Sequence, residues 1–152
     1  MHVTIAIGVN GPRLLVGAGE ALLRRDYSAS RQLAQQALAS VPVGSTTPEA
    51  QFTGAQARFI QALALLDGKA VIALPNSTFK QIEALLDQCL TTLPRRPSYI
   101  IVLGELYQQL KQVGFTVLAQ KGKHLLDVVQ TLPLDAIDQQ NLAYYWAAQP
   151  QR

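Results

Sequence analysis

Apolar residues recur along most of the chain at spacings of three and four, which is the period of an amphipathic α-helix. The longest such stripe consists of Phe52, Ala55, Phe59, Ala62, Leu63 and Leu66. Thr47 before it is a natural N-cap, and Pro48 fits the first helical position. Asp67-Gly68-Lys69 interrupts the period. This pattern predicts a long helix that begins at about residue 48 and ends at about residue 66.

The same period, with the residues that interrupt it, predicts six further helices. Asp26 can cap the second helix, which Pro42 ends, and Asp135 can cap the last. Ser98 is the expected cap of the helix that begins at Tyr99. For the helix that ends near residue 93, Thr78-Phe79-Lys80-Gln81 has capping-box spacing, and Asn76 or Ser77 can substitute as the cap. The predicted spans are 13–25, 28–40, 99–113, 115–131 and 135–147, together with the helix that ends near residue 93.

Two segments do not follow the helical period. Val3 to Val9 favours extended structure, and Asn10-Gly11-Pro12 separates it from the first helix. We therefore expect residues 1–12 to form an N-terminal segment and residues 13–152 to form a single α-helical domain, with 135–147 as its capping helix. The second segment, Ala70 to Pro75, is short, apolar and bounded by breakers. It is either a buried loop or the last turn of a helix, and we favour the loop.

The composition limits the classes of function. The chain has 152 residues, of which only 15% are charged, against about 25% in typical soluble domains. A charge-poor surface fits either neutral solvent-facing positions or a surface that rests against a partner. The net charge is +3, and the basic residues are scattered instead of forming one run, so nucleic acid is not an expected partner.

The single cysteine, Cys89, excludes an internal disulfide and any multi-cysteine zinc site. Its spacing places it on the apolar face of a helix, where we expect a buried, unreactive thiol. The N-terminus lacks the basic segment of a secretory signal, and no apolar run approaches the ~18 residues of a membrane span. We expect a cytoplasmic protein that does not enter membranes.

Motifs for catalysis, metals and cofactors are missing from the sequence. His124 is the only histidine beyond the terminus, and Asp127 three residues on is better explained as a solvated neighbour than as a metal partner. Arg95-Arg96 between two prolines could hold a phosphate or an acidic loop, although a solvated linker explains it more simply. We expect no catalytic residues, no metal and no cofactor, and therefore not an enzyme.

Two helical pairs carry small and bulky residues at particular spacings. The first pair has Leu14, Gly17, Ala18 and Ala21, then Ser30, Ala34, Ala37 and Pro42. The third begins with Leu103-Gly104-Glu105-Leu106-Tyr107. These positions resemble the tetratricopeptide repeat, in which L-G-x2-Y in one helix is followed by small residues and a closing proline in the next. The resemblance implies stacked helical pairs in a right-handed superhelix. A compact helical bundle without that relation is the alternative.

The resemblance also implies a function. Stacked pairs form a concave groove that binds an extended or helical peptide, so we expect a scaffold or adaptor for a protein partner. Exposed groove positions are expected at Leu15, Gly19 and Leu22 in the first pair and at Ile101, Glu105 and Gln108 in the third. Basic side chains available for acidic flanks of the partner are Arg24, Arg25 and Arg58.

Tyr144-Tyr145-Trp146 in the last helix has two possible roles. Large side chains of a terminal helix commonly cover the core of a helical stack, and we favour this role; aromatic residues also anchor partners at interfaces. Two alternatives to the scaffold remain open. One is a self-associating module in which charge-poor faces form a homodimer, and the other is a small-ligand or enzymatic helical domain with a pocket between helices.

Overall fold

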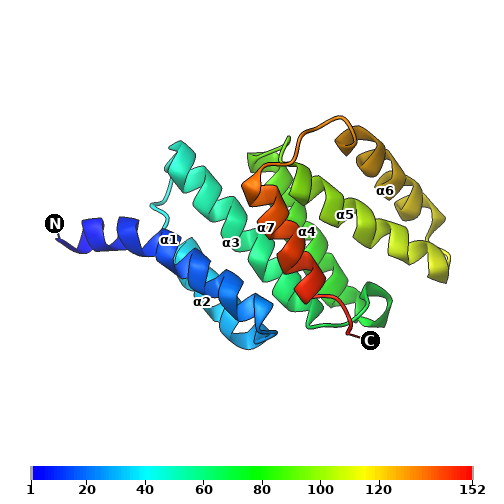
Figure 1. The fold of residues 1–152 in the computed structure, drawn as a ribbon, viewed down its shortest axis with the longest axis horizontal. Coiled ribbons are helices and arrows are strands. Elements are labelled where there is room, and N and C mark those ends of the chain that lie inside the picture. Colours follow the sequence, from blue (N-terminus) through cyan, green and yellow to red (C-terminus); the bar gives the residue numbers. More distant parts are fainter. Residues whose placement is uncertain (1, 152) are drawn as a thin grey trace.

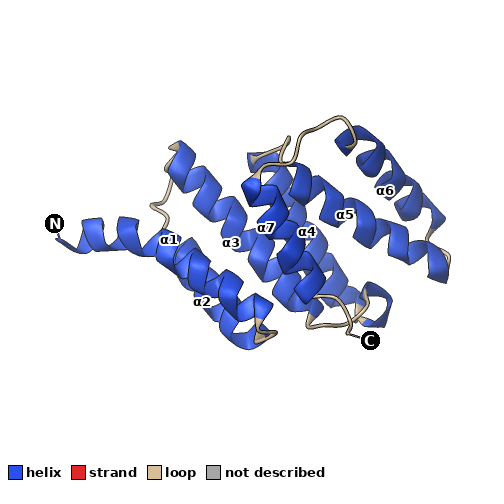
Figure 2. Ribbon diagram, viewed as in Figure 1, coloured by secondary structure: helices blue, strands red, loops and turns tan. Residues whose placement is uncertain are grey.

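The computed structural model describes the backbone of residues 2–151 and the side chains of residues 10–151. All regular structure in this range is helical, which confirms the all-α prediction (Figure 2). The α-helices are α1 (His2–Leu23), α2 (Tyr27–Ala39), α3 (Pro48–Leu66), α4 (Asn76–Thr92), α5 (Pro97–Gln109), α6 (Thr116–Val129) and α7 (Ala136–Ala147). Two short 3₁₀ helices, η1 (Val71–Ala73) and η2 (Leu110–Val113), lie between them.

The first six helices form three antiparallel pairs that lie side by side (Figure 1). In each pair consecutive helices pack against each other along their length, and α2 also packs against α3. α1 and α6 therefore lie at opposite ends of the stack. The last helix, α7, does not extend the stack. It returns across one side of it and contacts α1, α3 and α5.

Local chemistry sets several of the helix boundaries as predicted. The Asp26 side chain accepts a hydrogen bond from the Ala29 N–H at 3.2 Å, and the Thr47 hydroxyl accepts one from the Ala50 N–H at 3.2 Å. Each bond satisfies a backbone donor that has no partner within its helix. Asp135 caps α7 in the same way. At the other ends, Gly68 and Gly114 adopt φ angles of 71° and 90°, a region that favours glycine.

The structure corrects three predicted boundaries. Val3 to Val9 is helical instead of extended, because α1 begins at His2 and continues through Pro12. α4 begins at Asn76, directly after Pro75, and has no side-chain cap. α5 begins at Pro97, so Ser98 lies inside its first turn and is not the N-cap. The favoured loop at residues 70–75 contains the single turn η1, in which Val71 is buried.

One contiguous hydrophobic core runs between the helices; α6 packs the partly buried Leu118 and Leu125 against it. Its largest fully buried side chains include Phe59, Tyr99, Tyr107 and Leu86. Cys89 is also fully buried; its thiol donates to the Ala55 carbonyl at 3.1 Å, and burial raises its pKa to about 12. The thiol is therefore neutral at physiological pH, as expected for a cysteine that packs as a small apolar residue.

Candidate protein-interaction site

The inner face of the stack, formed by α1, α3 and α5, is covered by α7. In α1, Gly19 lies directly against the Tyr144 side chain, where a β-carbon would collide with the phenol ring. Leu15 and Leu22 are 8% and 0% exposed. The prediction that Leu15, Gly19 and Leu22 are exposed groove positions is therefore wrong, because the chain's own last helix occupies this face.

A buried hydrogen-bonded network joins α7 to α3 and α5. The Tyr99 hydroxyl donates to Gln56 Oε1 at 2.8 Å, and Gln56 Nε2 donates to Asn141 Oδ1 at 2.6 Å. Asn141 Nδ2 donates to Ser98 Oγ at 3.0 Å. All four side chains are buried, and burial raises the pKa of Tyr99, which keeps its hydroxyl a neutral donor. A satisfied buried network of this kind fixes α7 in one position.

Asp138 links the N-terminus of α7 to the N-terminus of α5. Its Oδ1 accepts hydrogen bonds from the Ser98 N–H and hydroxyl, and its Oδ2 accepts one from the Asp135 N–H at 3.1 Å. Arg96 Nη1 donates to Asp135 Oδ2 at 2.7 Å and lies 3.5 Å from Asp138 Oδ2. The hydrogen bond from the Asp138 N–H and the Arg96 guanidinium lower the pKa of Asp135 to about 2.

Arg96 belongs to the Arg95-Arg96 segment, for which the sequence favours a solvated linker over a phosphate-binding site. Its guanidinium already contacts two carboxylates of the α7 N-terminus. The N-terminus of α5, which would attract an anion, already has the Asp138 carboxylate on its Ser98 N–H. Neither group is available to a phosphate in this structure.

Arg25 and Tyr27, at the turn between α1 and α2, bind the C-terminus of α7. Arg25 Nη1 donates to the carbonyl oxygens of Ala147 and Gln149 at 2.8 and 3.1 Å. The Tyr27 hydroxyl also donates to the Ala147 carbonyl, at 2.8 Å. A cation at this end also interacts favourably with the helix dipole. Arg25 was predicted to meet a partner, but its guanidinium is bound within the fold.

The remaining predicted partner-binding residues are distributed over several surfaces. Ile101, Glu105 and Gln108 are half-buried, and the Gln108 amide donates to the Ala119 carbonyl in α6. Arg24 is exposed. Arg58 is half-buried and borders a cavity beside the α2–α3 loop. The structure does not bring these residues together in one groove.

The three aromatic residues of α7 divide into two groups. Tyr144 and Tyr145 are 4% and 1% exposed, whereas Trp146 is 62% exposed. Gln109 Nε2 donates to the Tyr145 hydroxyl at 3.2 Å, and burial together with the nearby Glu105 carboxylate raises the Tyr145 pKa. The two tyrosines cover the core along the inner face of the stack, and Trp146 points to solvent.

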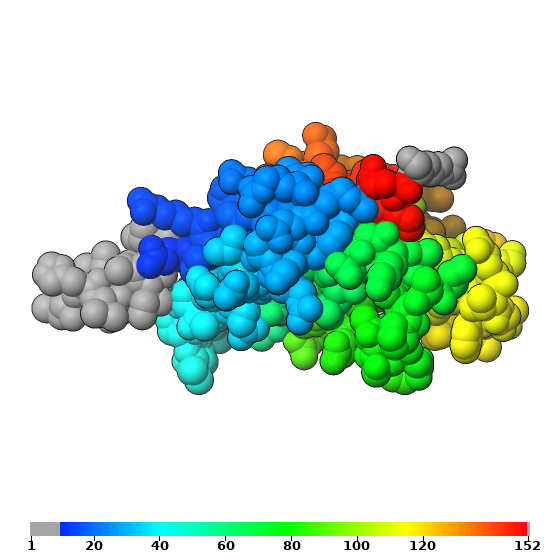
Figure 3. All heavy atoms as spheres, turned by 90° about the horizontal axis from the view of Figure 1, so that it is seen from below, coloured from blue at the N-terminus to red at the C-terminus, as the bar shows by residue number. Residues whose placement is uncertain are grey.

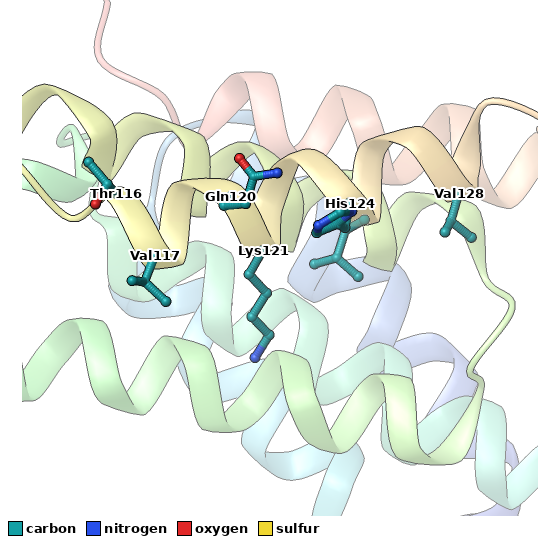
Figure 4. Close-up of a pocket in the computed structure, with 7 residues that line it drawn as sticks. Thr116, Val117, Gln120, Lys121, His124 and Val128 are labelled. Carbon is teal, nitrogen blue, oxygen red and sulfur yellow. The ribbon is translucent and has the colours of Figure 1, made fainter.

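A different surface stays open on α6. Val117, Lys121, His124 and Val128, which we call the α6 stripe, follow one another at spacings of four, three and four and so share one helix face. Val117 and Val128 are 81% and 61% exposed. The stripe borders an open surface hollow of about 580 Å³, which is lined by α6 alone, with Thr116, Gln120 and Leu125 as the other lining residues. Figure 4 shows Val117 and Lys121 projecting to one side of α6 and Gln120 to the other.

The α6 stripe combines apolar ends with a basic centre. The charged residues of α6 are Lys121 and Lys123 near its middle and Asp127 beside Val128 near its end, and Lys111 precedes the helix. Lys121 leans over the ring of Tyr107, with its Nζ 5.1 Å from the ring centroid. Burial raises the pKa of Asp87 on α4, and the charge of Lys121 opposes that rise. The lysine therefore lies across the surface between α6 and α4.

Further apolar side chains are exposed just before α6 and in η1. Ile72 in η1, Val113 in η2 and Phe115 are 43%, 50% and 55% exposed. They border a second cavity, of about 350 Å³, which is lined almost entirely by apolar side chains. Exposed apolar surface of this kind is typical of interaction sites.

A third hollow lies between α2 and α4, and most of its lining residues are polar. In Figure 3 the blue and cyan spheres of the first helices lie beside the green spheres of α4. The hollow has a volume of about 960 Å³, and its polar lining includes Gln32, Gln35, Gln36, Gln61 and Gln81. Gln61 Nε2 donates to Gln35 Oε1 at 2.7 Å. Neutral amide side chains of this kind are typical of a solvent-exposed surface.

Comparisons with protein-family models, curated proteins and solved structures found no match. Within residues 2–151, no helix has both the length and the apolar character needed to span a bilayer. No three histidine, cysteine, aspartate or glutamate side chains in the described part of the chain come together as metal ligands.

Sequence reasoning missed the residues that hold α7, although part of the signal was present. Gln56 interrupts the apolar run Ala55 to Ala57, where all three residues are buried. In α7, Asp138, Asn141 and Tyr145 follow one another at spacings of three and four, so two polar residues share the face of a buried aromatic one. Polar residues on an otherwise buried face indicate an internal network.

Proposed function

We propose that the protein is a non-catalytic interaction module and that the α6 stripe binds its protein partner. Stacked helical pairs commonly work as binding scaffolds, and the resemblance of two pairs to the tetratricopeptide repeat favours this class. The proposed surface differs from the concave groove expected from the sequence. α7 occupies that face and is fastened at both ends.

The observation that carries the proposal is the exposure of Val117 and Val128 on one face of an edge helix. Burying exposed apolar side chains of this size contributes roughly 25 cal/mol per Å² of area removed from water. The residues of the α6 stripe have the spacing that is found where two helices pack side by side, so a second helix can lie along the stripe.

The centre of the stripe specifies the partner's charge. Lys121 and His124 lie between the two valines, and Lys123 and Lys111 lie nearby in the sequence. A basic centre flanked by apolar residues is complementary to a helix that carries an acidic residue between apolar ones. The expected ligand is therefore an acidic amphipathic helix.

Site-specific photo-crosslinking tests this function. Benzoylphenylalanine replaces Val117 in the full chain, which is expressed in cells of the organism that encodes it. Val43, fully exposed in the α2–α3 loop, is the matched control position. We expect a discrete adduct from position 117 and none from position 43. Val128→Asp in the same chain should abolish the adduct, because it places a charge in the same apolar contact.

The outcomes separate the candidate functions. A discrete adduct lost with Val128→Asp supports the proposal, and its mass distinguishes another protein from a second copy of this chain. Equal labelling from positions 117 and 43, or none from 117, would contradict a binding role for α6.

A further inference from the structure

We infer that the α6 stripe binds α1 of a second copy of the same chain, so that copies join head to tail. The inference rests on the proposed function of α6 and names the partner. It comes from a second exposed stripe, formed by Val16, Glu20 and Leu23 in α1, which we call the α1 stripe.

The α1 stripe has the chemistry expected of the α6 ligand. Val16 and Leu23 are 57% and 50% exposed, and Glu20 between them is also exposed. The spacings of four and three place all three on one helix face. Glu20 is complementary to the basic centre of the α6 stripe, and Val16 to one of its apolar ends. The exposed Arg13 and Arg24 flank the α1 stripe along the chain.

Neighbouring helices leave the α1 stripe uncovered. On one flank of α1, Gly17 lies against Leu33 of α2, and on the other, Gly19 lies against Tyr144 of α7. Leu15 and Leu22 are buried in the core. The stripe therefore occupies the remaining face of α1, which points away from the rest of the stack.

The two stripes match at two of the three α1 positions in either relative direction of the helices. With α1 and α6 parallel, Val16 meets Val117 and Glu20 meets Lys121. With the helices antiparallel, Val16 meets Val128 and Glu20 meets His124. Each alignment follows from the shared spacing of four and three. In both, Glu20 lies opposite Lys121 or His124, and Leu23 lies opposite the other of these two residues.

The positions of the two helices determine the type of assembly. α1 and α6 lie at opposite ends of the stack (Figure 1), so one copy offers both surfaces at once. A contact between two different surfaces is heterologous and adds copies in a row unless the rotation closes a ring. The expected products are open chains or rings that grow with protein concentration, not a two-fold symmetric dimer.

Complementary blocking variants test this arrangement by sedimentation velocity. Val16→Asp blocks the α1 stripe and Val117→Asp blocks the α6 stripe; both side chains are more than half exposed, so the fold should tolerate the changes. Wild-type protein should form larger species from micromolar to millimolar concentration. Each variant alone should stay monomeric. An equimolar mixture should form a 1:1 heterodimer and nothing larger, because only one pair of intact surfaces remains.

A charge exchange tests the contact between the stripes. Glu20→Lys and Lys121→Glu should each weaken assembly, and the double variant should restore it if the helices pair in parallel. In the antiparallel case, Glu20→Lys combined with His124→Glu should restore it instead. Glu49→Lys, which makes the same charge change at an exposed site in α3, is the control and should assemble as wild type does.

Several results would overturn the inference. A wild-type monomer at all concentrations would do so, and so would failure of both charge exchanges. Dimers formed by Val16→Asp alone would indicate a symmetric α6–α6 contact instead. If position 117 crosslinks to a different protein while the wild type stays monomeric, the proposed function stands and the head-to-tail partner is wrong.

Discussion

Asp138 of α7 accepts hydrogen bonds from both the backbone N–H and the hydroxyl of Ser98 in α5, at 3.0 and 2.8 Å. Its other carboxylate oxygen accepts the Asp135 N–H at the start of α7. One buried side chain therefore satisfies backbone donors at the N-termini of two helices. This shared cap ties the last helix to the inner face of the stack.

Removing this carboxylate should be strongly destabilising. Asp138→Ala leaves the Ser98 donors without their acceptor and removes a partner of Arg96. Breaking a buried charged interaction by deleting one partner typically costs about 3–5 kcal/mol. Urea unfolding followed by circular dichroism measures the loss. Asp127→Ala, at an exposed position of α6, is the control and should change stability by less than about 0.5 kcal/mol.

The crossing of α5 and α6 depends on two glycines. A β-carbon at Gly122 would lie 2.5 Å from the Gly104 carbonyl oxygen and 2.8 Å from the Tyr107 β-carbon. Because the nearest atom belongs to the backbone, the helices would have to separate, and Gly122→Ala should destabilise the fold by about 1–3 kcal/mol. At Gly54 the nearest atom is the flexible end of Arg58, at 3.2 Å. Gly54→Ala should therefore be neutral or stabilising by up to about 1 kcal/mol. Equal losses in thermal unfolding would contradict this packing.

The core face of α4 allows a test of its register. Leu86 is fully buried between Ile82 and Cys89 on the same face. Leu86→Ala should cost about 2–5 kcal/mol, because it leaves a cavity as well as removing apolar contact. Val43→Ala is the exposed control. Chemical denaturation of both variants gives the comparison, and a loss below about 0.5 kcal/mol at Leu86 would mean that this face is not in the core.

The ion pair at the start of α7 should make stability depend on acid pH. The Asp138 N–H and the Arg96 guanidinium lower the pKa of Asp135 to about 2, below the value of about 3.9 in an unfolded chain. A depressed pKa in the folded state means that the contribution is present above about pH 4 and is lost as the pH falls towards 2. The amplitude is small, because the Asp135 side chain is half exposed. Urea midpoints measured across this range should fall less steeply for Asp135→Asn than for wild type.

Much of the fold follows from signals that are local in the sequence. Asp26, Thr47 and Asp135 were predicted to cap their helices, and each does so through a bond to a residue three positions on. Asp67-Gly68 and Gly114 end elements where the backbone needs positive φ. Such signals depend on neighbouring residues alone, so they can be read without knowing the tertiary structure.

The errors arise where distant residues decide the outcome. Val3 to Val9 was predicted to be extended because β-branched residues precede Asn10-Gly11-Pro12, but this preference is weak and the helix continues through the proline. Ser98 lies at a helix start as expected, yet its partner is Asp138, forty residues away. The open groove failed as a prediction for the same reason, since nothing local to Gly19 indicates that Tyr144 lies against it.

Native-state hydrogen exchange tests most directly whether α7 is a fixed part of the fold, which is the reason for placing partner binding on α6. The measured quantity is the opening free energy of amides from Asn141 to Tyr145, compared with amides from Gln56 to Ile60 in α3. If the bonds at both ends hold α7 in place, the two sets should exchange with the same free energy, that of global unfolding. An opening free energy for α7 several kcal/mol below that of α3 would contradict the account, because α7 would then leave the inner face and open the groove to a partner.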